Sequence, residues 1–192
     1  MLVAALWLMA SRAGLHPLGF REPVVLLTAV HFHFAGFASA EMAALTYRRL
    51  RDTVWARGLG VAVMGVVCGP GLLGLAFLAG PKLKLAAALL IAVSQFGLAA
   101  AMFRVGLVAR ISERLLVGVA GGSVLLGMLL VAAWAIGEYP LQPFVDMRQM
   151  AEFHGVLNAI GFAFCGLLGW AQLQAKVEDT ASVAMQKSAH EN

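Results

Sequence analysis

Long apolar stretches alternate with short polar ones along the 192-residue chain. A helix needs roughly 20 apolar residues to cross a bilayer. Five stretches meet this length, and we expect membrane-spanning helices at about residues 23–47, 59–80, 85–109, 115–137 and 149–173. The apolar run at residues 1–10 is too short to span and predicts a short N-terminal segment, or the end of a helix that begins in a longer protein. Whether Met1 is a natural start or a fragment boundary stays open.

Composition supports this pattern, because 61% of the residues are hydrophobic and only 12% are charged. Soluble domains have about 45–50% apolar and about 25% charged residues, so a soluble enzyme and a nucleic-acid binder are both excluded. The predicted fold class is all-α, a polytopic membrane helix bundle with five full spans plus a short N-terminal apolar segment. We expect residues 1–174 to form a single bundle and residues 175–192 to form a mobile cytoplasmic tail.

Charge in the connections predicts the orientation in a cell membrane. If the loop after the first span is cytoplasmic, that side holds nine of the 14 Lys and Arg residues and the other side holds five. Basic loops stay on the cytoplasmic side, so the C-terminus is predicted inside and the start of the first span outside. Arg104, close to the end of the third span, is expected to extend its side chain to the inner interface.

Glycine and proline mark two positions within the spans. Cys68-Gly69-Pro70-Gly71 lies at the centre of the second span and predicts a kink or break, because proline removes a helical hydrogen bond. Gly118 and Gly122 in the fourth span have the spacing that lets two helices approach closely. We expect this pair to pack inside the bundle, with a homodimer or a partner membrane subunit as the alternative.

Polar residues inside apolar helices are costly and often mark a site. The first span contains His31 and His33, followed by Glu41. Successive helical residues are rotated by about 100°, so the two histidines are about 160° apart around the helix and cannot share one narrow face. We therefore expect one histidine to face a site and the other to bond elsewhere, without specifying which.

The last span carries one polar or small stripe. Its members recur at helical spacing, and they are His154, Asn158, Gly161, Cys165, Gly169 and Gln172. The stripe is either a packing seam or one wall of a site. A seam alone needs no histidine at its outer end.

Depth in the membrane connects these two spans. His31 or His33, with His154 and Asn158, are expected to line one polar cavity in the outer half of the bundle, with Gln95 of the third span as a further wall. Candidate acid or base groups, with no catalytic role assigned, are His31, His33, Glu41, Glu152 and His154.

The segments HFHFAGF (31–37) and EFHGVLNAIGFAFCGLLGW (152–170) resemble the YndJ-like family of bacterial integral membrane proteins. That family has a similar paired-histidine aromatic motif in one helix and a histidine-glycine, asparagine and glycine-phenylalanine motif in a later one. The resemblance implies a transporter-like protein and points to His31, His33, His154 and Asn158. Family members are longer, with additional helices before this region.

Three functional classes remain open, with a non-catalytic subunit or a sensor as a fourth alternative. A transporter-type protein would move or sense a small solute, and the Cys68–Gly71 break would favour it. A membrane-embedded acid/base enzyme, of the isomerase or cyclase class, would act on a lipid-soluble substrate. A haem or copper protein would use His31, His33 and His154 as ligands, although the spacing of His31 and His33 suits a single ion poorly. No cofactor and no metal are expected in the first two classes.

Overall fold

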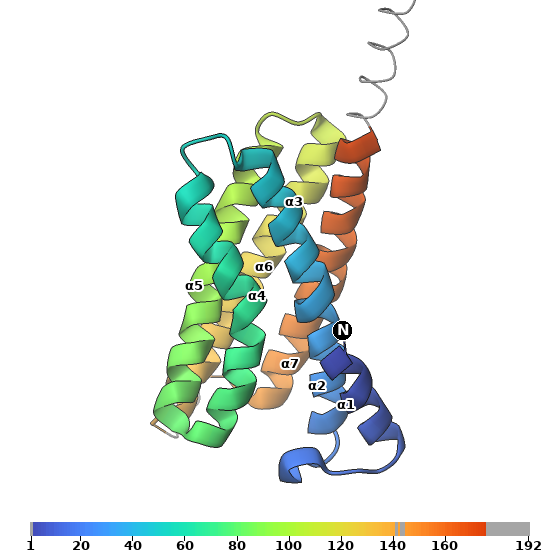
Figure 1. The fold of residues 1–192 in the computed structure, drawn as a ribbon, viewed down its shortest axis with the longest axis vertical. Coiled ribbons are helices and arrows are strands. Elements are labelled where there is room, and N and C mark those ends of the chain that lie inside the picture. Colours follow the sequence, from blue (N-terminus) through green and yellow to red (C-terminus); the bar gives the residue numbers. More distant parts are fainter. Residues whose placement is uncertain (1, 141, 143–144, 176–192) are drawn as a thin grey trace, which may run out of the picture.

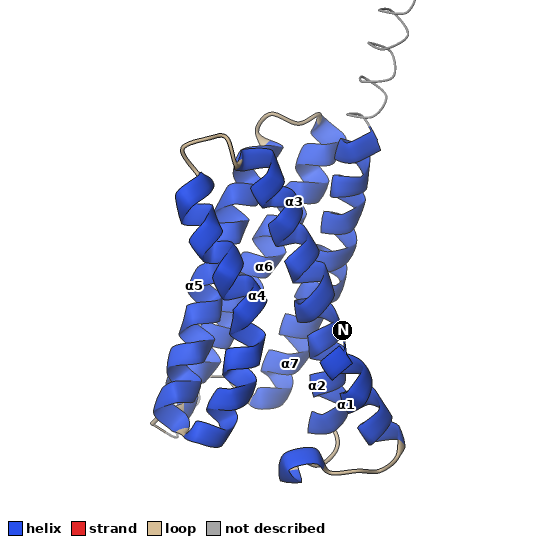
Figure 2. Cartoon of the chain, in the orientation of Figure 1, coloured by secondary structure: helices blue, strands red, loops and turns tan. Residues whose placement is uncertain are grey.

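The computed structural model is all α-helical and describes residues 2–140, 142 and 145–175 (Figures 1 and 2). It begins with the short apolar helix α1 (Leu2–Arg12) and a 3-10 turn at Pro17–Gly19. Five helices long and apolar enough to cross a membrane follow. Of the tail expected at residues 175–192, all but Ala175 lies outside the described residues.

The five spans agree with the predicted ones, with boundaries that differ by at most four residues. They are Val24–Leu50, composed of α2 (Val24–His33), η2 (Phe34–Ser39) and α3 (Ala40–Leu50); α4 (Ala56–Ala79); α5 (Pro81–Gly106); α6 (Ile111–Glu138); and Met147–Ala175, which begins with α7 (Met147–Val156) and η3 (Leu157–Phe164). The chain is therefore a multi-pass membrane protein.

The spans run alternately up and down, and each connection is short (Figure 1). Gly80 forms the turn between α4 and α5, with a φ of 116° that a side chain would disfavour, and Pro81 then starts α5. Asp146 starts α7, because its carboxylate accepts hydrogen bonds from the backbone N–H groups of Arg148 and Gln149 at 2.6 and 3.4 Å. In Figure 1, α1 packs against α2 at the lower end of the bundle.

The core consists mainly of small and aliphatic side chains. Leu98, Met102 and Val117 are fully buried, and Phe162 of η3 is almost fully buried. Large apolar side chains also lie on the outside of the bundle, which fits contact with lipid. Leu75, for example, is 66% exposed. At the lower end, Lys84 and Glu138 join α5 to α6 through an ion pair of 2.7 Å.

Of the kink or break predicted at Cys68–Gly71, the break is wrong, because α4 continues as a helix through Pro70, and the kink stays a prediction. Proline removes one backbone hydrogen bond, and membrane helices tolerate this loss when neighbouring helices hold them in place. The α4 helix packs against its neighbour α5, which provides that support (Figure 1).

The irregular segments lie elsewhere, in the first and last spans. Residues Phe34–Ser39 (η2) and Leu157–Phe164 (η3) are π-helical, and the two segments contact each other. A π turn accommodates an extra residue within a helix and frequently occurs at functional sites. The sequence pattern did not predict either one.

The packing expected at Gly118 and Gly122 is also wrong. A Cβ atom built on either residue meets nothing within 4 Å, so both residues face away from their neighbours in the bundle. Close approach of α6 to the last span uses a different glycine, Gly161, whose Cβ would overlap Ser123. The homodimer alternative for Gly118 and Gly122 stays a prediction.

Replacing Gly161 with alanine should destabilise the bundle by about 1–3 kcal/mol, because overpacking a tight contact forces its neighbours apart. Gly155→Ala on the same span is the matched control, since its Cβ would meet nothing within 4 Å. Thermal unfolding of the purified protein in detergent measures both variants. Equal melting temperatures for the two would contradict the close approach of Gly161 to Ser123.

Candidate functional site

His31 of α2 and His154 of α7 face each other across the bundle. Their ring centroids are 6.4 Å apart and their planes are inclined by 26°, which is a stacked arrangement. Each histidine lies seven residues after the start of its span, at Val24 or Met147. At 1.5 Å per helical residue, both lie roughly 10 Å into the membrane from the same end. The histidine motif of the first span and that of the last span therefore lie next to each other at the same depth.

His33 does not join this pair. Its Nδ1 atom donates a hydrogen bond to the carbonyl oxygen of Ala29, one turn earlier on its own helix, at 2.8 Å. This follows from the wide angular separation between His31 and His33. Of the two histidines, His31 is the one that contacts the last span.

Asn158 and Gly127 position the ring of His154. The Asn158 Nδ2 atom donates to the His154 carbonyl oxygen at 2.8 Å and lies 3.1 Å from His154 Nδ1. His154 Nδ1 also lies 3.3 Å from the carbonyl oxygen of Gly127 on α6. A protonated Nδ1 donates to Gly127, whereas an unprotonated Nδ1 accepts from Asn158. His154 thus has a partner for its Nδ1 atom in either tautomer.

The glycine at position 127 leaves the space that these two side chains occupy. A Cβ atom there would lie 3.1 Å from Asn158 Nδ2 and 3.4 Å from His154 Nδ1. Gly127 is buried, and any larger residue would displace the polar pair. Sequence reasoning missed Gly127, because nothing in the fourth span indicated which of its glycines faces the last span.

Gln95 lies in a separate polar contact, deeper in the bundle. Its Nε2 atom donates to the Ser39 hydroxyl at 3.2 Å, and its Oε1 atom is buried without a hydrogen-bond partner among the described residues. Ser39 is eight residues beyond His31 along the same span, which is roughly 12 Å in a helix. The structure therefore pairs Gln95 with Ser39, not with the histidines.

The two glutamates also lie apart from the histidine pair. Glu152 is exposed at the start of α7, where its Oε1 atom accepts from Arg148 Nε at 2.8 Å. Glu41 is exposed on α3, ten residues beyond His31. The five acid/base candidates are therefore not assembled, and the structure brings together only His31 and His154.

The surroundings of His31 differ from those of His154. The side chain of His31 is exposed, while His154 and Asn158 are half-buried. Among the described residues, no side chain or backbone group makes a hydrogen bond to the His31 ring. Its aromatic neighbours are His154 and Phe32, the latter edge-on with the ring centroids 6.0 Å apart. An imidazole within a span that lacks a protein partner is available to bind a solute or exchange a proton.

The structure does not assemble the three-histidine ligand set of the haem or copper alternative. Within residues 2–140, 142 and 145–175, no three His, Cys, Asp or Glu side chains form a group that could hold a metal. His33, the third ligand of that alternative, bonds its own helix.

The contact between the histidines can be tested with cysteine pairs. With Cys68 and Cys165 replaced by serine, His31→Cys with His154→Cys should be joined by a short bifunctional thiol reagent, since the native rings are in contact. His33→Cys with His154→Cys is the matched control and should not be joined. Peptide mass spectrometry reads the cross-link. Equal cross-linking of both pairs would contradict the assignment of His31 as the residue that faces the last span.

The comparisons with known proteins agree with the resemblance seen in the motifs. A family model described as YndJ-like protein matches residues 1–162, a range that includes His31, His154 and Asn158. No curated protein sequence and no solved structure matches the chain. The match covers most of the chain, and the chain therefore belongs to the YndJ-like family.

Proposed function

We propose that this protein is a transporter-type membrane protein that moves or senses a small polar solute. His31, His154 and Asn158 line the proposed site, which opens to water in the outer half of the bundle. The contact between His31 and His154 is the observation that carries the proposal. It brings together one histidine from each of the two spans with the lowest mean hydropathy.

Energetic cost is the first argument for a functional site. Ionisable residues within membrane spans are expensive and normally serve a site or a pathway. His33 and His154 both have a backbone partner, which gives each a structural reason to be present. His31 has no such partner among the described residues, so packing alone does not explain it.

The π-helical segments are the second argument. η2 begins three residues after His31 and η3 begins three residues after His154. When a π turn moves along a helix, the residues that it passes rotate relative to the rest of the span. Two such segments in contact give the histidines a way to change their facing without breaking either helix. In this proposal they replace the discontinuous helix expected at Pro70.

The distribution of arginines supports the side on which the site opens. The connection between α3 and α4 and the one between α5 and α6 lie at the end of the bundle opposite to the histidines (Figure 1). These connections and the adjacent helix ends carry Arg48, Arg49, Arg51, Arg57, Arg104, Arg110 and Arg114. A cytoplasmic location for this end, and for the C-terminus, places the histidine pair in the outer half of a cell membrane.

Thiol labelling tests the proposed opening. In a background with Cys68 and Cys165 replaced by serine, His31→Cys should react rapidly with a charged, membrane-impermeant methanethiosulfonate added outside, because thiols react as thiolates in contact with water. His33→Cys, two residues further along and on another face of the same helix, should react more slowly. The measurement is the rate of mass increase in the protein reconstituted in liposomes of known orientation.

The same variants separate transport from catalysis. Protection of His31→Cys from the charged reagent on both sides, together with rapid reaction with a lipid-soluble maleimide, would overturn the solute site and favour an enzyme that acts on a lipid-soluble substrate. Labelling only from the side of the seven arginines would overturn the placement in the outer half. Equal rates for His31→Cys and His33→Cys would show general exposure and no site.

A further inference from the structure

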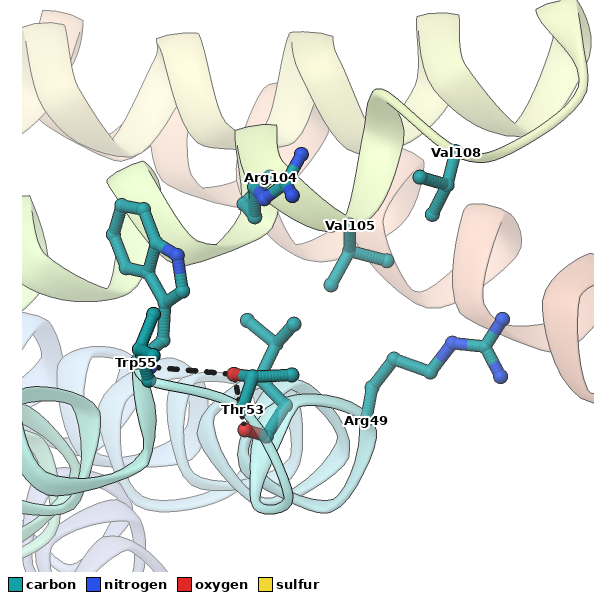
Figure 3. A pocket seen from close by; sticks show the side chains of 8 residues that line it. Arg49, Thr53, Trp55, Arg104, Val105 and Val108 are labelled. Carbon is teal, nitrogen blue, oxygen red and sulfur yellow. Dashed lines mark hydrogen bonds between the residues drawn. The ribbon is translucent and has the colours of Figure 1, made fainter.

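A hollow of about 290 Å³ lies at the opposite end of the bundle from the histidine pair. It lies between the end of α3, the connection from α3 to α4, and the end of α5 (Figure 3). Its lining consists of Arg49, Leu50, Thr53, Val54, Trp55, Arg104, Val105 and Val108. The proposed solute site does not use any of these residues.

The position of the hollow coincides with the membrane surface. The first span ends at Leu50 and the third at Gly106, so the lining residues lie at the boundary between the hydrocarbon core and the headgroups. Trp55 is 40% exposed there, and tryptophan is enriched at this boundary. Any ligand of the hollow thus meets apolar chains on one side and water on the other.

Apolar walls face this boundary. Val54 and Val108 are 96% and 69% exposed, and Leu50 and Val105 close the base of the hollow from the core side. A fully water-soluble anion gains little from such walls, whereas the glycerol and upper acyl region of a lipid is matched by them. The lining therefore favours an amphipathic ligand.

Two guanidinium groups supply the polar part of the hollow. Arg49 comes from α3 and Arg104 from α5, and Figure 3 shows them on different sides of the hollow, with the Arg49 guanidinium pointing away from Arg104. Neither makes an ion pair or side-chain hydrogen bond among the described residues. Guanidinium groups bind phosphate oxygens with well-matched geometry.

The nearby carboxylates do not neutralise these two arginines. Asp52 forms an ion pair with Arg51, with 3.5 Å between Asp52 Oδ2 and Arg51 Nε. Glu113 is buried, and its Oε2 atom accepts from the backbone N–H of Arg110 at 2.9 Å. The guanidinium of Arg114 donates to the carbonyl oxygens of Gly106 and Leu107 at the end of α5. Arg49 and Arg104 are thus left to attract an anion.

Thr53 stabilises the turn between α3 and α4, which carries Trp55 at the hollow. The Thr53 hydroxyl donates to the Leu50 carbonyl oxygen at 2.7 Å and accepts from the backbone N–H of Trp55 at 3.3 Å (Figure 3). These two bonds fix the turn between α3 and α4. The hollow is consequently built from a defined turn and two helix ends.

We propose that this hollow binds an anionic phospholipid, with Arg49 and Arg104 attracting its charged headgroup and with its glycerol and upper acyl region against Val54, Trp55 and Val108. Basic pockets between helices at the cytoplasmic surface are suited to anionic headgroups. The two arginines select for negative charge, and the apolar walls select for a lipid over free phosphate.

Native mass spectrometry of the full chain, released from detergent, tests this proposal with three probes: phosphatidylglycerol, phosphatidylcholine and inorganic phosphate. The wild-type protein should retain phosphatidylglycerol in preference to the other two. Each of Arg49→Gln and Arg104→Gln should weaken phosphatidylglycerol binding about fivefold, and the double variant should weaken it further. Arg49→Lys keeps the charge and should restore part of the affinity.

Arg48→Gln is the matched control, because Arg48 belongs to the same basic end but does not line the hollow. Val108→Trp is the second variant, which fills the hollow from an exposed position without changing the charge, and it should also reduce binding of phosphatidylglycerol. Equal losses for Arg48→Gln and Arg49→Gln would show a diffuse surface charge and overturn the proposal. Unchanged binding in the double variant or in Val108→Trp, or equal binding of inorganic phosphate, would overturn it as well.

Discussion

Hydrocarbon offers no hydrogen-bond partners, and this constraint governs every polar group in the five spans. Backbone groups meet it by forming helices, including through Pro70, where the rest of α4 and its packing on α5 compensate for one lost bond. Side chains meet it in local contacts, as His33 does with the Ala29 carbonyl and Gln95 does with Ser39. Against this background a polar side chain without a protein partner stands out, and among the histidines of the spans it is His31.

The spans could be predicted from the sequence because hydropathy over about 20 residues reports directly on transfer into lipid. The pairing of the two polar motifs could also be predicted, because His31 and His154 lie at the same depth from the same end of their spans. Which histidine faces the last span could not be predicted, because the rotation of a helix depends on its neighbours. The same reason explains the errors at Gly118 and Gly122, which have a suitable spacing but lie on the wrong face of α6.

The π-helical segments illustrate a different limit of sequence reasoning. An extra residue in one turn leaves hydropathy unchanged, so a window average does not detect η2 or η3. Their consequence is local and geometrical, because each rotates the residues before it relative to those after it. Despite η3, His154 and Asn158 lie against Gly127 and Gly161 packs against Ser123, and both Gly127 and Ser123 are on α6. These three members of the predicted stripe therefore do share one neighbouring helix.

The first span links the two ends of the molecule. It carries His31 two turns from its start and Arg49 next to its last residue, with η2 between them. One side of η2 is held by Gln95 through Ser39, and the other contacts η3. The π-helical segment between His31 and Arg49 therefore contacts both the third span and the last span. Any shift in the packing of η2 against these two spans would act on the residues to either side of it, because a π turn changes the rotation of a helix at one place.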